Sequence, residues 1–173
     1  SEMCIRDRVI TYVNEETGSE ITLIPADEYQ ITTMVDFGTK ILGTQNAYLN
    51  KLSDFKNEIA DARTFSFLHE LETLIDHGLI KGGDLNNAIV YVDKEISDTT
   101  MQKLKKIFNK DEITVKPNGV LDNLTLHYPN EAARHKLLDV IGDLALVGTR
   151  IRGKVIATKP GHFTNTQFAK KLL

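Results

Sequence analysis

Three ionisable side chains recur at intervals of four residues in an otherwise apolar stretch. They are His135, Asp139 and Asp143, in a segment at about 130–147 whose apolar residues recur with the period of a helix. On a helix the three share one face, because residues four apart lie one turn apart. An imidazole and a carboxylate in this arrangement can bind zinc together. They can equally form an ordinary ion pair at the edge of a core helix, which is the commoner outcome of so short a pattern.

A fourth candidate is His162, which follows Lys159-Pro160-Gly161 at a predicted strand-to-helix turn. Functional side chains favour such turns, because a rigid scaffold positions an exposed loop. If His162 meets Asp143, the carboxylate would orient an imidazole that acts as a general acid or stabilises an oxyanion. A metal held by His135 and Asp139 would lower the pKa of a bound water and so supply the nucleophile. A chance stripe in an unrelated α+β protein would instead leave Asp143 and His162 far apart.

The remaining histidines carry weaker signals. His69 is expected to face solvent, and His127 ends a predicted strand without an obvious partner. His77 lies at the end of a predicted helix, where a cation is favourable against the helix dipole. None of the three is predicted to belong to a site.

The surrounding elements follow from apolar periodicity and turn residues. Residues 36–46 are predicted to be a loop, and an antiparallel meander is the simplest arrangement of the first three strands. The order of elements favours an α+β fold, a two-layer sandwich of β-sheet and helices with a small inserted β-α-β subregion. Strands are predicted at 9–13, 21–24, 31–35, 88–92, 113–116, 120–126 and 151–158, and helices at 53–62, 67–77, 98–110, 130–147 and from 162 or 163 onward.

Composition narrows the classes of function. The 173 residues carry a net charge of −3 with dispersed basic residues, so nothing suggests a nucleic-acid footprint and no nucleic-acid partner is expected. A single cysteine, Cys4, excludes an intramolecular disulfide and fits a reducing compartment, so a cytoplasmic location is expected. No apolar stretch approaches the ~20 residues of a membrane span. Ser1 to Arg8 lacks periodicity and resembles a translated sequencing adapter, so it is predicted to be an appended or disordered segment preceding a domain at 9–173.

Four ordered motifs resemble one enzyme family. RHKLLDVIGD, followed by KPGH and Asn165, resembles the metal and catalytic segments of the zinc-dependent UDP-3-O-acyl-N-acetylglucosamine deacetylases, which catalyse the committed step of lipid A synthesis. ARTFSFLHELETL and GLIKGGDLNNAIV resemble two further segments of that family, in the same order. The resemblance covers residues 9–173 and corresponds to the second of the family's two domains.

The amino-acid sequences of three segments are most similar to one branch of that family. VDFGTKILGTQNA, GDLNNAIVYVD and ATKPGHFTNTQF resemble the branch in which the deacetylase is fused to a 3-hydroxyacyl-acyl-carrier-protein dehydratase. The resemblance therefore implies a fused dehydratase as a possible partner, although no dehydratase segment is present up to Leu173.

The resemblance implies a role for each catalytic residue. His135 and Asp139 would be two of three protein ligands of Zn²⁺, and Asp143 would orient His162. The protonated His162 would stabilise the oxyanion or assist the leaving amine. Thr64, in the ARTF segment, would hydrogen-bond the zinc-bound carbonyl oxygen of the substrate.

The resemblance also implies contacts with a UDP-linked acylated glucosamine. Lys136 and Lys159 would meet the charged UDP portion, where a point cation suits phosphate. Asn165 would support the His162 turn, and Phe65 would line the sugar site. The passage for the acyl chain would be lined by Leu68, Leu71, Gly83, Leu85 and Val90. An ordinary core role for these last five fits their residue types equally well.

One departure from the family pattern concerns the third zinc ligand and the general base. In the family these are adjacent residues of a Glu-His pair in the first domain, and this sequence contains no Glu-His dipeptide; His69-Glu70 has the reverse order. Two ligands fall short of catalytic zinc, which has three plus water. The chain alone is therefore expected to be inactive. The face carrying His135, Asp139 and His162 is expected to pack against the first domain and to be apolar or concave when exposed. The alternative is a non-catalytic domain that binds the UDP-lipid or supports a fusion partner.

Overall fold

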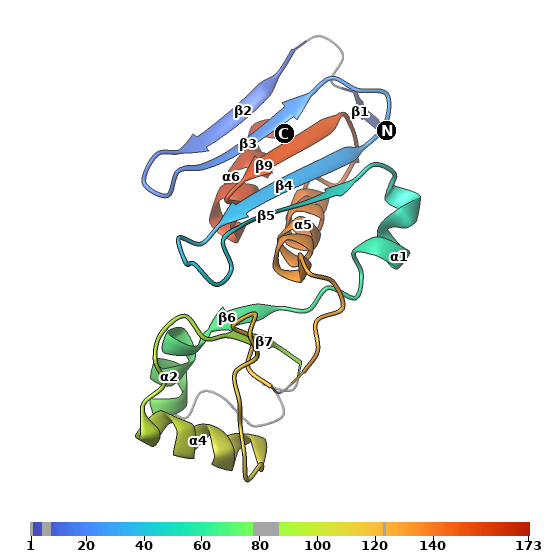
Figure 1. Cartoon of the computed structure of the whole chain (residues 1–173). Helices are drawn as coiled ribbons and strands as arrows, with labels where there is room; N and C mark the ends of the chain where they lie inside the picture. The colour runs from blue at the N-terminus through green and yellow to red at the C-terminus, as the bar shows by residue number, and fades with distance from the viewer. Residues whose placement is uncertain (1, 5–7, 78–86, 123) are drawn as a thin grey trace. The chain divides into compact units, whose positions relative to one another are not determined.

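The computed structural model describes residues 2–4, 8–77, 87–122 and 124–173, and the chain divides into two compact units (Figure 1). Unit 1 comprises Ser1–Asp36, Thr44–Ala62 and Asn130–Leu173. Unit 2 comprises Phe37–Gly43 and Arg63–Pro129, so it is inserted twice into the sequence of unit 1.

Unit 1 is built on a five-stranded sheet. In spatial order its strands are β2 (Ile10–Asn14), β3 (Ser19–Ile24), β9 (Lys154–Thr158), β4 (Gln30–Asp36) and β5 (Thr44–Leu49). The last strand in sequence, β9, therefore lies between β3 and β4, antiparallel to the first and parallel to the second. The predicted antiparallel meander is wrong, because the apolar Val155 and Ala157 of β9 are buried in the centre of the sheet.

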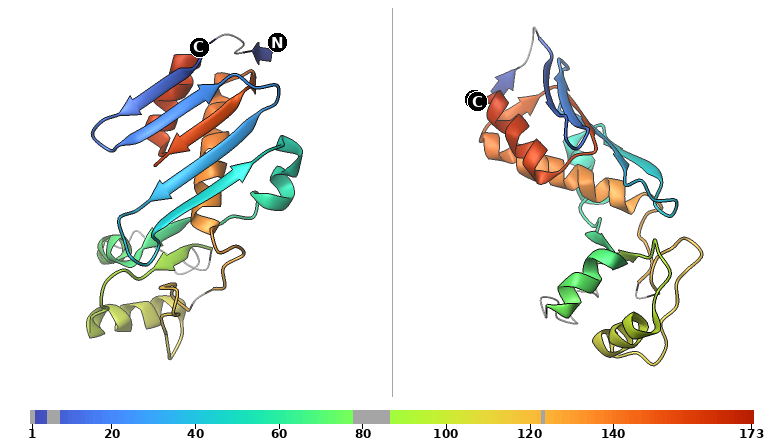
Figure 2. Two further views of the ribbon diagram at one scale, coloured as in Figure 1. Left: turned by 45° about the horizontal axis from the view of Figure 1, so that its top comes forward. Right: turned by 90° about the vertical axis from the view of Figure 1, so that its left-hand side faces the viewer.

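Two helices cover one face of this sheet, α5 (Glu131–Leu144) and α6 (His162–Leu172), as the right-hand view of Figure 2 shows. Alternate residues of the strands point toward them, which explains why Ile21 and Leu23 are buried while Thr22 between them is not. From the helix side, Leu137 and Val140 of α5 are fully buried. The predicted α+β class, with a sheet layer and a helix layer, is confirmed.

Several element boundaries in unit 1 differ from the sequence prediction. The helix predicted at 53–62 is reduced to a 3₁₀ turn, η1 (Leu52–Asp54), and one α-turn, α1 (Phe55–Glu58). Residues 44–49, placed partly in a loop, form β5, whose Ala47 and Leu49 are buried in the sheet. The strand predicted at 151–158 is split at Gly153 into β8 (Arg150–Arg152) and β9. The helix predicted at 130–147 continues past α5 as a second 3₁₀ turn, η2 (Ala145–Val147).

A three-residue strand, β1 (Glu2–Cys4), pairs in parallel with β8. This strand lies within residues 1–8, the segment whose lack of periodicity distinguishes it from the domain at 9–173. That residues 1–8 are an appended segment stays a prediction.

Unit 2 contains the expected β-α-β insertion. The strands β6 (Phe65–Phe67) and β7 (Ile89–Tyr91) pair in parallel, and α2 (Leu68–Asp76) follows β6 directly. A further helix, α4 (Asp98–Phe108), begins at Ser97, whose hydroxyl accepts from the Thr100 amide.

Two predictions in unit 2 differ from the structure. In the described residues of 113–122 and 124–126, the expected strands at 113–116 and 120–126 are reduced to isolated bridges, one of which joins Val115 to Leu121, while Asn123 lies outside the described residues. The His69 side chain is 38% exposed, as expected, but its Nδ1 also lies 2.9 Å from Asp93 Oδ1 and its ring stacks on Phe67. A carboxylate contributed by a distant loop is not foreseeable from local periodicity.

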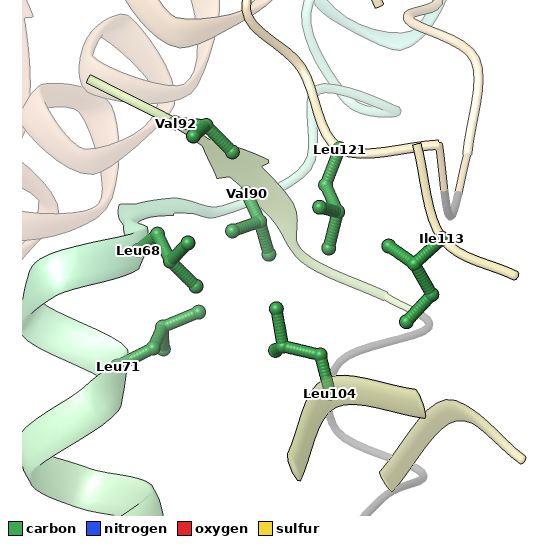
Figure 3. Close-up of a cluster of buried hydrophobic side chains, with 7 residues drawn as sticks. All are labelled: Leu68, Leu71, Val90, Val92, Leu104, Ile113 and Leu121. Atoms are coloured by element: carbon green, nitrogen blue, oxygen red, sulfur yellow. The ribbon is translucent and has the colours of Figure 1, made fainter. Parts of the chain in front are cut away.

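The core of unit 2 is a cluster of seven buried apolar side chains (Figure 3). They come from α2, from β7 and the residue after it, from α4 and from the segment that follows α4, and they point toward one another. Apolar burial of this kind is the dominant stabilising contribution to folding. The members are Leu68, Leu71, Val90, Val92, Leu104, Ile113 and Leu121.

Truncation of Leu104 tests this core. Leu104 is fully buried at the base of the cluster, so Leu104→Ala is expected to lower the free energy of unfolding by about 2–5 kcal/mol through lost burial and a residual cavity. Urea denaturation measures the change. The matched control is Gln102→Ala, an exposed position of the same helix, with an expected effect within about 0.5 kcal/mol. Equal effects of the two substitutions would contradict the assigned core.

None of the helices in the described part of the chain combines the length and the apolar character that a membrane crossing requires.

Candidate metal and catalytic site

The helix α5 positions the stripe of ionisable residues. Its apolar residues Ala133, Leu137, Val140 and Leu144 are buried against the sheet, and their spacing of three or four fixes which side of the helix faces inward. Asn130 occupies the N-cap position of the helix but does not cap it through its side chain. Its amide instead donates to the Asn46 carbonyl at 2.9 Å, which ties the start of α5 to β5.

His135 and Asp139 lie side by side on α5, with His135 Nε2 3.5 Å from Asp139 Oδ1. His135 Nδ1 lies 3.2 Å from the carbonyl oxygen of Ala62, which can only accept a hydrogen bond, so this ring nitrogen carries a proton. In the neutral ring, Nε2 then presents a lone pair next to a carboxylate oxygen. Two acceptors facing one another need a cation or a second ring proton between them.

These donors fit a zinc ion. Metal-bound histidines commonly donate their other ring N–H to a carbonyl, as His135 does toward Ala62. Two ligand atoms about 2.0–2.1 Å from a tetrahedral zinc are roughly 3.3 Å apart, close to the 3.5 Å found here. The second oxygen of Asp139 is engaged by Lys136 Nζ at 3.1 Å, so Oδ1 is the oxygen that would bind a metal. Within the described residues, no set of three His, Cys, Asp or Glu side chains is grouped to hold a metal.

Asp143 and His162 meet, although they are nineteen residues apart in sequence. His162 Nδ1 donates to Asp143 Oδ2 at 2.8 Å, and the side-chain amide of Asn165 (Nδ2) donates to the same oxygen at 2.8 Å. The Asp143 side chain is 16% exposed and that of His162 is 70% exposed. The ring is therefore held at Nδ1 by a largely buried carboxylate, while Nε2 is the nitrogen left for chemistry. This contact counts against a chance stripe, which would leave the two residues apart.

The remaining site residues in unit 1 flank these pairs. Lys136 engages Asp139, so its ammonium lies at the metal pair, and Lys159 is exposed in the turn before His162. Asn165 is fully buried and acts on Asp143 directly, a contact that the sequence prediction, support of the His162 turn, did not include. The contribution of the Ala62 carbonyl was also missed, since a backbone oxygen leaves no signal in the residue type.

The other predicted site residues belong to unit 2. Thr64 is exposed, and the ring of Phe65 packs edge-on against Phe37 with centroids 5.1 Å apart. Leu68, Leu71 and Val90 are buried members of the core cluster, as the core interpretation of these residues expected. Gly83 and Leu85 lie outside the described residues. A role of these five residues in an acyl passage stays a prediction.

The surface around the stripe carries exposed apolar side chains. Phe163, next to His162, is 64% exposed, and Leu146, one turn beyond Asp143, is 71% exposed. A pocket of about 770 Å³ in unit 1 is lined by other residues, among them Tyr29, Leu52, Ile141 and Arg152, and by none of the predicted site residues. Burial raises the pKa of the Tyr29 phenol above its usual range. Near His135, Asp139 and His162 the expected apolar character is thus limited to single exposed residues. The pocket of unit 1 does not include these three residues.

Comparisons with known proteins agree with these motifs. The family model described as "UDP-3-O-acyl N-acetylglycosamine deacetylase" matches residues 2–113 and 100–173. The chain is 42% identical over 163 residues to a "Bifunctional enzyme LpxC/FabZ" of Bacteroides thetaiotaomicron, covering 94% of this chain and 35% of the relative. It is 44% identical over 155 residues to the enzyme of the same name from Porphyromonas gingivalis, covering 90% of this chain and 34% of the relative.

A relative that is named as a deacetylase alone, and not as a bifunctional enzyme, is also similar. The "UDP-3-O-acyl-N-acetylglucosamine deacetylase" of Syntrophotalea carbinolica is 34% identical over 165 residues, covering 95% of this chain and 45% of the relative. The chain thus spans between about a third and a half of the length of these relatives. Because the family model matches nearly the whole chain, the chain belongs to the UDP-3-O-acyl N-acetylglycosamine deacetylase family.

Proposed function

We propose that this chain carries one half of the active site of a zinc-dependent deacetylase of UDP-3-O-(3-hydroxyacyl)-N-acetylglucosamine in lipid A biosynthesis. The proposal is carried by one observation: the pairs His135–Asp139 and Asp143–His162 lie next to one another along one face of α5. His135 Nε2 faces Asp139 Oδ1, and one turn further His162 is bonded to Asp143. The names of the relatives supply the substrate class, and the bifunctional relatives support a fused dehydratase as a partner.

His135 and Asp139 would hold Zn²⁺, which when bound supplies Lewis acidity for the attack on the acetamide carbonyl. The Ala62 carbonyl keeps His135 in the tautomer that is protonated on Nδ1 and has its lone pair on Nε2, and Lys136 keeps Asp139 monodentate. These contacts orient both ligand atoms before a metal arrives, which raises metal affinity and fixes geometry.

His162 would move or hold the proton. Its Nδ1–H is committed to Asp143, so the proton that reaches the substrate is carried on Nε2. Placed near the reacting carbonyl, this N–H would stabilise the developing oxyanion or protonate the departing amine. Asp143 supplies the negative charge beside the ring, and Asn165 fixes the carboxylate. Thr64, Phe65 and Lys159 would bind the substrate, as the family resemblance implies.

The isolated chain is expected to be inactive. Its sequence lacks the Glu-His pair that provides the third ligand and the general base in the family pattern, and without a base no group activates the attacking water. Hydrolysis of the acylated UDP-sugar by the zinc-supplemented chain measures this, with the Bacteroides thetaiotaomicron relative as the positive control. Turnover comparable to that of the relative would contradict the half-site.

A non-catalytic role is the second candidate. The grouping of two rather than three metal-binding side chains in the described residues favours a domain that binds the UDP-lipid or supports a fused dehydratase. Zinc binding separates the candidates, because a structural ion pair between His135 and Asp139 would take up no metal.

A further inference from the structure

The turn that presents His162 contains an unfavourable backbone conformation. Lys159 has φ of +48°, in the left-handed region that residues with a Cβ atom rarely occupy. Such conformations persist only where surrounding contacts hold them, and they cluster at functional sites. The contacts that hold Lys159 therefore determine where the next residues, up to His162, are placed.

Two hydrogen bonds fix the Lys159 peptide groups. The Lys159 amide donates to the Met34 carbonyl of β4 at 2.7 Å, which extends the pairing of β4 with β9. On the other side, the Ser19 hydroxyl donates to the Lys159 carbonyl at 2.7 Å. Ser19 is the first residue of β3 and only 5% exposed, so the donor side of this part-buried bond lies inside the protein.

Thr17 orients the Ser19 hydroxyl. Thr17 Oγ1 donates to Ser19 Oγ at 2.8 Å and accepts from the Ser19 amide at 3.3 Å. The incoming bond from Thr17 occupies an acceptor site of Ser19 Oγ, which leaves the proton of Ser19 for the Lys159 carbonyl. The connection between β2 and β3 thus acts on a turn that follows it by 140 residues.

The constraint extends to the imidazole. The Gly161 carbonyl accepts a hydrogen bond from the backbone amide of Asn165 at 2.8 Å, and the Asn165 side chain donates a hydrogen bond to Asp143. We propose that Ser19, oriented by Thr17, is a positioning residue that holds the Lys159–Gly161 turn so that His162 Nδ1 stays on Asp143. The proposal rests on the proposed function only in naming His162 as the catalytic imidazole; the contacts and the test need neither zinc nor substrate.

The test is the Ser19→Ala variant of the whole chain, followed by NMR. We expect exchange of the Lys159 amide to become about fivefold faster, the factor for one hydrogen bond of ordinary strength. We also expect the ¹⁵N spectrum of the neutral His162 ring to lose part of its Nδ1–H tautomer, because the contact with Asp143 is populated less. Ser19→Thr, which keeps the hydroxyl, should restore both signals.

A matched control lies on the same two strands. Thr11 and Thr22 share a hydroxyl hydrogen bond of 2.9 Å between β2 and β3, and Thr22→Val removes it without touching the turn. This variant should leave the His162 tautomer unchanged. If Ser19→Ala does not fold, Thr17→Val, at an exposed position, should shift the same two signals in the same direction by less.

A double substitution tests the physical cause. Glycine adopts positive φ without a Cβ penalty, so in a Lys159→Gly background the turn needs less support and Ser19→Ala should alter the His162 tautomer less. The proposal is overturned if Ser19→Ala, or Thr17→Val in its place, leaves the tautomer unchanged, or if Thr22→Val changes it equally. If these NMR results are obtained but an enzyme that supplies the third ligand and the general base to this chain is inactive, the proposed function alone is contradicted.

Discussion

Replacement of His135 by alanine is expected to lower the affinity of the chain for zinc by about 100-fold or more, because losing a ligand costs more than the roughly 10- to 100-fold typical of losing an outer-shell partner. In the proposed site His135 contributes one of two protein donors, and its Nε2 is already turned toward Asp139 Oδ1 at 3.5 Å. Loss of the imidazole leaves one monodentate carboxylate that is shared with Lys136. A single carboxylate next to an ammonium does not retain zinc. Isothermal titration of the isolated chain with zinc measures the change, and Asp139→Ala should behave alike.

The control for this prediction is a histidine outside the site. His77 is exposed in unit 2, and its Nδ1 contacts the Thr73 carbonyl, so His77→Ala removes an imidazole without altering the stripe. Zinc affinity should then equal that of the unsubstituted chain. Equal zinc uptake by all three variants, or none by the unsubstituted chain, would contradict a metal site at His135 and Asp139.

Asp143→Asn is expected to reduce kcat by about 10²- to 10⁴-fold in an active enzyme that contains this chain. The amide oxygen can still accept from His162 Nδ1 and Asn165 Nδ2, so the packing is preserved. What disappears is the negative charge beside an imidazole that carries positive charge when it stabilises the oxyanion or donates to the amine. KM should change little, because Asp143 acts through His162.

A chimera provides the active enzyme. In it, this chain replaces the matching 35% of the Bacteroides thetaiotaomicron relative, whose remaining sequence supplies the expected third ligand and base. The control is Asp122→Asn, which neutralises an exposed carboxylate 3.4 Å from Lys116 in unit 2. An Asp143→Asn enzyme that kept its kcat, or that changed only in KM, would remove Asp143 and His162 from the proposed mechanism.

Local pattern was sufficient for the helix that carries the site. The apolar residues of α5 recur every three or four positions, so the sequence predicts both the helix and the shared face of His135, Asp139 and Asp143. Local pattern failed for β5, whose segment TQNAYL offers only Ala47 and Leu49 as inward apolar residues. It also failed for the described residues of 113–126, where the β-type residues make only the isolated bridges Tyr91–Val120 and Val115–Leu121 rather than continuous strands.

Strand order shows why the rest required the fold. Whether β9 pairs beside β3, β4 or at an edge depends on contacts between residues more than a hundred positions apart, such as Leu23 with Val155. No local spacing encodes such pairing. A meander was the simplest arrangement of strands that follow one another in sequence. In the structure the apolar strand β9 pairs between β3 and β4 instead, so these two strands are not neighbours.

By itself, the sequence determined the residue types of the site, their common helix face and the turn that carries His162, because helical periodicity and turn chemistry are local properties. The tertiary structure alone decided that Asp143 and His162 touch, that the Ala62 carbonyl contacts His135, and that the Ser19 hydroxyl donates to the Lys159 carbonyl. These contacts join segments 19 to 140 residues apart, and one of them uses an atom that every residue possesses. Their formation depends on the packing of α5, α6 and β9, which only the folded chain specifies.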